Sequence, residues 1–164
     1  GQGMIASLKA AYFQQIGRLE IIPEFGLTYS KIWQDGFTET GAGSLNLRVA
    51  DADAYSVVTS LGVRLGTSLE AGNTPLRVQG LLRYDYDWKA GDDNAHKVTA
   101  SLAEVPALGA MSIIGQNRGA NGFTVGGAAT ALVAKNIDLF AGATYRWNDS
   151  GNEYTLGAGV RGWW

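Results

Sequence analysis

The sequence predicts an all-β protein, an antiparallel up-and-down β-barrel whose strands cross a membrane. Three observations lead to this fold class. Glycine is abundant, with 23 residues among 164, and a composition of this kind disfavours a helical bundle. Five long segments alternate between apolar and polar residues, which is the period of a β-strand. The connections are short at one end of the expected sheet and longer at the other, as in membrane barrels.

Strict alternation marks the five clearest strands. One face of these segments carries a single charge, Lys31, whereas the other face carries eleven. Each segment has 11 to 15 residues, enough to cross a bilayer at a tilt, which takes about 9–11 residues. Two further strands, at residues 4–14 and 124–134, are expected where the alternation is weaker. The five clear strands span residues 19–33, 55–69, 76–88, 137–147 and 153–164.

The connections between these strands alternate in length. Residues 97–102, inside one of the long connections, alternate weakly and are expected to form a loop extension or an extra strand. Three tight turns are expected at residues 16–18, 71–75 and 135–136, and the connections at the opposite end are residues 35–54, 89–123 and 148–152.

Aromatic residues gather on the apolar face at the long-loop end of the strands. Tyrosine and tryptophan favour the boundary between membrane and water, because the ring is apolar and its polar group can reach water. The sequence therefore predicts an aromatic belt at one membrane interface. Its nine members are Tyr29, Trp33, Tyr55, Tyr84, Tyr86, Trp88, Tyr145, Trp147 and Tyr154.

The alternation alone does not say which face of the barrel points outward. A soluble barrel turns its apolar face inward, whereas a membrane barrel turns it toward lipid. The belt favours the membrane barrel, and so do the glycines among the charges, since a narrow lumen needs small residues beside long ones. Those glycines are Gly26, Gly62, Gly66, Gly142, Gly157 and Gly159.

The charged face is then the expected lining of the lumen. Its charges either neutralise one another in a wet, narrow interior, which is the simpler interpretation, or contact a passing polypeptide or tune a pore. The predicted lumen-lining residues are Glu20, Glu24, Arg64, Arg77, Arg83, Asp85 and Arg161.

Signals for catalysis, metals and nucleic acid are weak. The chain has no cysteine, and its one histidine, His96, lies in a long connection, so we expect no zinc site. The acidic residues at 51–53 and 92–93 could hold calcium from a loop, although solvated turn acids are the simpler interpretation. Neither a nucleophile elbow nor a phosphate-binding loop is present. Because these motifs are missing, we expect no enzyme activity and no cofactor. The net charge of −2 gives no reason to expect a nucleic-acid partner.

Four stretches of the chain resemble the β-domain of type V autotransporters. They are residues 23–30 (PEFGLTYS), 35–47 (DGFTETGAGSLNL), 60–65 (SLGVRL) and 154–164 (YTLGAGVRGWW). The resemblance implies a twelve-stranded barrel in the bacterial outer membrane that anchors a passenger and helps to export it to the cell surface. It also implies an assembly signal in the last strand, read by the barrel-assembly machinery, at Tyr154, Val160 and Trp164.

Seven strands are fewer than the family's twelve, so we expect residues 1–164 to be the C-terminal portion of one autotransporter β-domain. An odd number of strands places the two termini at opposite ends of the meander. Because an unpaired strand edge is costly in lipid, missing N-terminal strands or another copy must close the barrel. The expected partners are outer-membrane lipid, the assembly machinery and a covalently linked passenger. Two alternatives remain at this point: a small non-secretory outer-membrane barrel, such as an adhesin or pore, and a soluble ligand-binding β-barrel.

Overall fold

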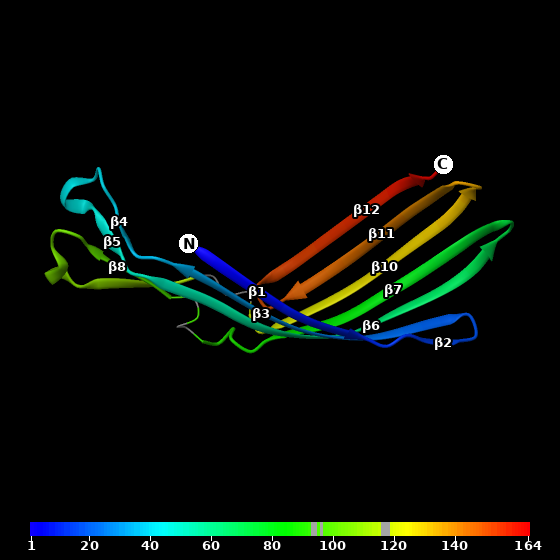
Figure 1. Cartoon of the computed structure of the whole chain (residues 1–164), viewed down its shortest axis with the longest axis horizontal. Coiled ribbons are helices and arrows are strands. Elements are labelled where there is room, and N and C mark those ends of the chain that lie inside the picture. The colour runs from blue at the N-terminus through cyan, green and yellow to red at the C-terminus, as the bar shows by residue number, and fades with distance from the viewer. Residues whose placement is uncertain (93–94, 96, 116–118) are drawn as a thin grey trace.

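The computed structural model describes residues 1–92, 95, 97–115 and 119–164, and its strands form two antiparallel sheets (Figure 1). The predicted all-β, antiparallel fold is confirmed. The larger sheet has the order β1-β3-β6-β7-β10-β11-β12, with β2 paired to β3. Its strands are β1 (Gln2–Ala11), β2 (Gln14–Ile16), β3 (Leu19–Gln34), β6 (Ala52–Ala71), β7 (Thr74–Asp87), β10 (Asn121–Ala134), β11 (Ile137–Asn148) and β12 (Gly151–Gly162).

The smaller sheet was not foreseen as a unit. It has the order β4-β5-β8-β9 and is built from the two long connections, at the left end of Figure 1. Its third strand corresponds to the weak alternation at residues 97–102. Its strands are β4 (Phe37–Thr38), β5 (Leu47–Val49), β8 (Lys97–Leu102) and β9 (Ala110–Ile114), accompanied by the short 3-10 helices η1 (Gly43–Leu45) and η3 (Pro106–Leu108).

The first predicted strand, residues 4–14, is split into β1 and β2. Both pieces pair with β3 in one continuous register, from Gln2 opposite Trp33 to Ile16 opposite Leu19. The break lies opposite Pro23. Proline has no backbone N–H, so only one ladder bond forms there, from the Tyr12 N–H to the Pro23 carbonyl at 3.1 Å. The strand therefore continues in direction but loses regular pairing at one point.

Two-residue turns close the short-turn end of the large sheet, at the right of Figure 1. Gly17 and Gly72 each occupy the first turn position with φ near +61° and +65°, a conformation that favours glycine and suits a tight hairpin. The third turn consists of residues 135–136, as predicted. At the opposite end, the predicted connection 148–152 shortens to two residues, because Asn148 pairs with Gly151.

The large sheet is curved and open (Figure 1). Among the described residues, no strand pairs with the outer edge of β1 or of β12. Both edge strands run from the long-loop end to the short-turn end, since Gln2 lies opposite Trp33 and Gly162 lies opposite Ile137. The two edge strands thus run in the same direction, so they could pair with each other only in parallel.

The large sheet has almost no apolar core of its own. Within the part of the chain that the structure describes, the buried apolar residues are two alanines, Ala90 and Ala95. Large apolar side chains stay exposed, including Leu156 at 83% and Val160 at 68%. No helix in the described ranges combines the length and the apolar character needed to traverse a membrane.

Candidate functional site: the charged face of the large sheet

The strand register places all seven predicted lumen-lining residues on one face of the large sheet. Glu24 on β3 lies opposite Gly62 on β6, which lies opposite Arg83 on β7, and every second residue along each strand shares this face. Near the other edge of the sheet, Arg161 on β12 lies opposite Asp138 on β11, and both residues belong to this face. We call this surface the charged face. Its side chains meet in four groups.

The first group is an ion pair that crosses a whole strand. Arg77 on β7 reaches over β6 to Glu20 on β3, with 2.5 Å between Arg77 Nη2 and Glu20 Oε2. Gly66 on β6 lies beneath this bridge, and a Cβ there would stand 2.9 Å from Glu20 Oε2. Glycine at this position therefore leaves the space that the ion pair occupies.

Two simpler ion pairs join neighbouring strands. Arg64 on β6 contacts Glu24 on β3, with 2.6 Å between Nη2 and Oε1. Arg161 on β12 forms an ion pair with Asp138 on β11, whose side chain is only 10% exposed. In both pairs the arginine stays well exposed while the carboxylate is more covered. Exposed pairs of this kind add little stability but fix the direction of the side chains.

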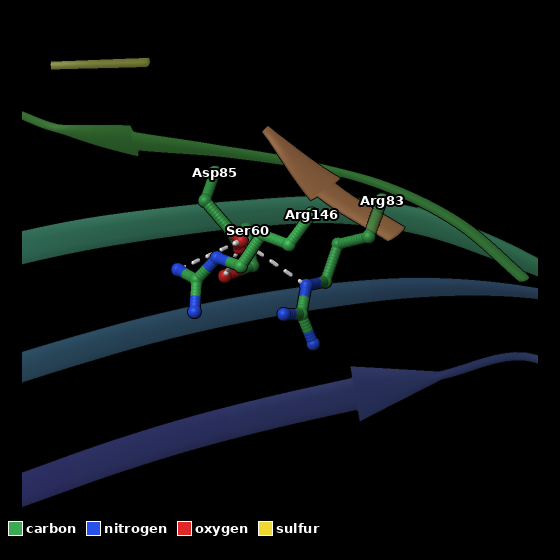
Figure 2. A network of polar contacts seen from close by, with 4 residues as sticks. All are labelled: Ser60, Arg83, Asp85 and Arg146. Carbon is green, nitrogen blue, oxygen red and sulfur yellow. Dashed lines mark hydrogen bonds and ion pairs between the residues drawn. The ribbon is translucent and has the colours of Figure 1, made fainter. Parts of the chain in front are cut away.

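Asp85 forms the centre of the fourth group (Figure 2). Ser60 donates a hydrogen bond of 2.6 Å to its Oδ1, and Arg83 Nε donates one of 3.2 Å to its Oδ2. Arg146, from β11, brings a second guanidinium to within 3.8 Å. Since the Asp85 side chain is 9% exposed, these partners offset the cost of burying a carboxylate. The network ties β6, β7 and β11 together across β10.

Sequence reasoning missed three members of these groups: Ser60, Asp138 and Arg146. The alternation within residues 137–147 already places Asp138 and Arg146 on the charged face, so the pattern of the sequence was enough to predict both as members of it. Ser60 carries no charge, and only the register reveals its role. All seven predicted residues have an ionic partner, as the simpler interpretation of mutual neutralisation expects.

The charged face is hollowed. One concavity of about 370 Å³ lies over β1, β3, β6 and β7 and is lined by Lys9, Glu24, Ser60, Arg64 and Arg83, among others. A second, of about 400 Å³, lies over β10, β11 and β12 and is lined mostly by glycine, alanine and threonine. Residues such as Ala128, Thr130, Gly142, Thr144 and Gly157 in its lining belong to the same face.

The opposite face carries the nine aromatic residues of the predicted belt. Several contact one another: the rings of Tyr86 and Trp88 meet edge to face at 5.0 Å, and those of Tyr145 and Tyr154 lie 4.9 Å apart. Trp88 also contacts the neighbouring strand, since its Nε1 donates to Thr59 Oγ1 at 2.8 Å. The remaining members, Tyr29, Trp33, Tyr55, Tyr84 and Trp147, share this face by register.

Tyr55 and Lys31 connect the belt to the long loops. The Tyr55 hydroxyl donates a hydrogen bond of 2.7 Å to Asp92, and Lys31 forms an ion pair of 2.7 Å with Asp53. The Lys31 ammonium also lies 5.2 Å from the centre of the Trp33 ring. The Lys31 amine, the single charge on the apolar face, is thus engaged within the chain.

Two of the three residues predicted for the assembly signal, Tyr154 and Val160, lie in β12 on the aromatic face and are exposed. The third, Trp164, lies beyond the end of β12 and is fully exposed. The predicted strand reached Trp164, whereas regular pairing stops at Gly162, which faces Ile137 at the end of β11. One more bond follows, from the Trp163 N–H to the Asn136 carbonyl at 3.2 Å.

The candidate metal ligands do not converge among the described residues. No group of three or more histidine, aspartate or glutamate side chains gathers there with the spacing of a metal site. Asp53 contacts Lys31, and Asp92 accepts from Tyr55. His96 and Asp93 lie outside the described residues.

Comparison with known proteins identifies the family. The family model described as Autotransporter beta-domain matches residues 1–144, which is most of the chain. No curated protein matches it. The match covers both members of the Glu20–Arg77 and Glu24–Arg64 pairs, the Asp85 group apart from Arg146, and six of the nine residues of the aromatic belt. The chain belongs to the autotransporter β-domain family, a family of outer-membrane translocator domains.

Proposed function

We propose that residues 1–164 form the C-terminal portion of an autotransporter β-domain that anchors a covalently linked passenger and assists its export. In this proposal the charged face lines the lumen and the aromatic face contacts outer-membrane lipid. The domain works by providing a passage and an anchor, with no catalytic step of its own.

The curvature of the charged face is the observation that carries this proposal. Both concavities described above hollow that face, as expected of the inner wall of a barrel. Its ion pairs keep the arginines and carboxylates compensated inside a narrow, wet space. The other face offers lipid a continuous apolar surface, with exposed side chains such as Leu61, Leu82 and Leu156. A soluble barrel would instead turn that apolar face inward, so this arrangement favours the membrane.

The direction of the edge strands favours one route to closure. β1 and β12 run the same way across the sheet. A second copy in the same membrane orientation would join β12 to β1 in parallel at each junction. An odd number of additional strands would let every neighbour pair antiparallel, as membrane barrels do. We therefore infer that strands elsewhere in the polypeptide close the barrel, rather than another copy.

Partners of the last strand follow from the same proposal. Tyr154, Val160 and Trp164 are exposed at the C-terminal edge, where the barrel-assembly machinery could pair with or contact β12. No strand in the described part of the chain pairs with the outer edge of β12, so its backbone N–H and C=O groups are open to that interaction.

Surface labelling of the full-length protein in intact cells tests the orientation that export requires. Ser44 lies in η1 at the long-loop end, and Asn73 lies in the turn between β6 and β7. The chain has no cysteine, so Ser44→Cys and Asn73→Cys add one thiol each to this domain, in a background freed of any passenger cysteine.

An impermeant maleimide is expected to label Ser44→Cys on intact cells and Asn73→Cys only after the outer membrane is permeabilised. Protease added outside should remove the passenger from the same cells. Labelling of Asn73→Cys alone on intact cells, or a passenger that stays inside while the barrel is inserted, would contradict the proposed function.

A further inference from the structure

The small sheet at the long-loop end has one apolar face. In its register, Phe37 lies opposite Val49, Val49 opposite Ala100, and Ala100 opposite Met111. Residues two positions away along each strand share that face. Its side chains remain open, with Phe37 47% exposed and Met111 59%. The set comprises Phe37, Leu47, Val49, Val98, Ala100, Leu102, Met111 and Ile113, and we call it the apolar loop face.

The apolar loop face continues the aromatic face of the large sheet. The last pair between β3 and β6 is Gln34 with Ala52, and the first pair between β4 and β5 is Phe37 with Val49. Two residues separate these pairs on each strand, so no residue is inserted and the alternation of side chains carries over without a shift. Phe37 therefore lies on the same side of the hairpin as Trp33, a member of the aromatic belt.

Residues 35–36 and 50–51 join the two sheets. Gly36 lies against the partner strand, where a Cβ would stand 2.9 Å from a backbone carbonyl oxygen, so the two strands stay together across this interval. By the same alternation, Asp35 and Asp51 belong to the aromatic face, between the belt and the apolar loop face. The β4–β5 hairpin turns away from the line of β3 and β6 at this point (Figure 1). A polar band and a bend thus separate the apolar loop face from the wall of the barrel.

The other face of the small sheet is basic. It carries Arg48 and Lys97, together with a contact of 3.1 Å between the hydroxyls of Thr99 and Ser112. The four strands of the small sheet contain these two cations and no acidic residue. The whole chain, in contrast, has 15 acidic residues and 13 basic ones. A chain with an excess of acids therefore places cations, without acids, in the sheet that has the open apolar face.

This combination of surfaces fits the surface of a membrane. An exposed apolar patch marks a contact with either a protein or a membrane. Amphipathic elements with one apolar and one basic face lie in the plane of a membrane interface, where anionic headgroups attract the cations. The long stems of Arg48 and Lys97 let their charges reach around a thin sheet toward those headgroups. The continuity with the face that we assign to lipid favours the membrane over a protein.

We propose that the apolar loop face rests on the outer leaflet of the membrane, with anionic headgroups bound by Arg48 and Lys97. The ligand is an amphiphile with acyl chains and a phosphate-bearing headgroup. In this arrangement the small sheet leans outward from the mouth of the barrel and does not cover it. The proposal rests on the proposed function, since the barrel must first be inserted with its aromatic face toward lipid.

Adjacent residues of β9 provide a matched pair of labelling sites. Ile113 belongs to the apolar loop face, whereas Ser112 lies opposite Thr99 on the basic face, and both residues are exposed. The full-length protein, freed of any passenger cysteine, is made as Ser112→Cys or Ile113→Cys, labelled with bimane, and reconstituted in vesicles of phosphatidylcholine and phosphatidylglycerol. Quenching by lipid brominated near the top of the acyl chains is compared with quenching by aqueous iodide. Val63→Cys, on the aromatic face of β6, is the reference for a label in lipid.

Brominated lipid should quench the label at Ile113, and iodide should quench the label at Ser112. Iodide quenching at both positions, with lipid quenching at Val63, would overturn the proposal and leave the proposed function intact. A label at Ile113 that neither quencher reaches would show that polypeptide covers this face, and it would also overturn the proposal. Failure of brominated lipid to quench the label at Val63 would instead refute the proposed function.

The phosphatidylglycerol content of the vesicles provides a second measurement. Arg48→Gln and Lys97→Gln are made separately in the Ile113→Cys protein, and Arg18→Gln, in the turn between β2 and β3 at the opposite end, is the control. Each loop cation should raise the ratio of docked to undocked sheet about fivefold in anionic membranes. Lipid quenching at Ile113 should therefore need more phosphatidylglycerol in both loop variants but not in Arg18→Gln. Equal curves for all three proteins would overturn the proposed headgroup contact.

Discussion

The two halves of the charged face are built differently. Over β3, β6 and β7, ion pairs cover the surface, and one of them spans three strands. Over β10, β11 and β12, the middle rows carry glycine, alanine and threonine together with Phe140, and charges stand only toward the ends, as at Arg146 and the Arg161–Asp138 pair. Ion pairs thus dominate the first half, whereas small residues and one aromatic ring occupy the middle rows of the second half.

Two glycines of the charged face, one in each half, have different surroundings. In the first, Gly66 leaves room for the Glu20–Arg77 bridge. In the second, Gly157 has no neighbouring atom within 4 Å of the position of a Cβ. Gly66 thus accommodates an ion pair, whereas Gly157 leaves open space above the sheet, and Gly159 on the same face lies against the Phe140 ring. The difference can be tested by making identical changes in both halves.

The largest effect is expected from removing the charge of Asp85. In Asp85→Asn, two guanidinium groups, from Arg83 and Arg146, lose their shared carboxylate. Breaking a buried ion pair costs about 3–5 kcal/mol, and because both arginines are 38% exposed, we expect about 2 kcal/mol. The measurement is the free energy of unfolding of the full-length protein folded in lipid vesicles, from denaturant titration.

Asp138→Asn is the matched control for this prediction. The Asp138 side chain is as covered as that of Asp85, but its partner Arg161 is 67% exposed and stays hydrated when the carboxylate is lost. The cost should remain within about 1 kcal/mol. Equal losses in the two variants would mean that the halves do not differ in the way that we describe.

A smaller effect is expected from filling the glycine positions. In Gly66→Val the new side chain displaces the Glu20 carboxylate and weakens its pair with Arg77, at a cost of about 1 kcal/mol. Gly157→Val meets no neighbour and adds a residue that favours strands, so the free energy of unfolding should be unchanged or higher. A destabilised Gly157→Val with a normal Gly66→Val would reverse the comparison.

The smallest effect concerns the turn between β11 and β12. The Asp149 carboxylate accepts hydrogen bonds from the backbone N–H of Asn121 at 2.9 Å and from its side-chain amide at 3.1 Å. These bonds lower the pKa of Asp149 below its ordinary value of 3.8, against the opposing effect of partial desolvation. A lowered folded-state pKa gives a contribution that is present above pH 3.8 and is lost as the pH falls through the folded-state pKa.

Comparing wild type with Asp149→Asn across pH measures that contribution. The difference in unfolding midpoint should be constant from about pH 6 down to the ordinary carboxyl pKa and should vanish in stronger acid. A difference that persists in strong acid, or that grows there, would show that the hydrogen bonds do not favour the charged form.

Most of the large sheet was predictable from alternation because a membrane strand exposes its two faces to different solvents. β3, β7 and β11 begin and end within two residues of the predicted bounds. The same alternation assigned Glu20, Arg77 and the other charged residues to one face. It could not assign partners, since Arg77 reaches Glu20 across an intervening strand and only the register shows that.

Three features escaped sequence reasoning for physical reasons. The break between β1 and β2 depends on Tyr12 lying opposite Pro23. The position of a proline in the sequence does not show which residue of the neighbouring strand lies opposite it. The small sheet joins two connections far apart in the chain, and its strands β4 and β5 have two and three residues, too few for a period to be read. Ser60 is an uncharged residue whose contact with Asp85 follows from pairing alone.

The central claim is that the charged face meets water in the lumen and the aromatic face meets lipid, in both halves of the sheet. Single cysteines at neighbouring positions test it: Val63 and Arg64 on β6, and Ala143 and Thr144 on β11. Arg64 and Thr144 lie in one cross-strand row of the charged face, and Val63 and Ala143 lie on the other face. With a bimane attached to each thiol in the folded, full-length protein, brominated lipid should quench the labels at Val63 and Ala143, and aqueous iodide should quench those at Arg64 and Thr144. Lipid quenching at Arg64 and Thr144, or the same response from neighbouring residues, would contradict the account.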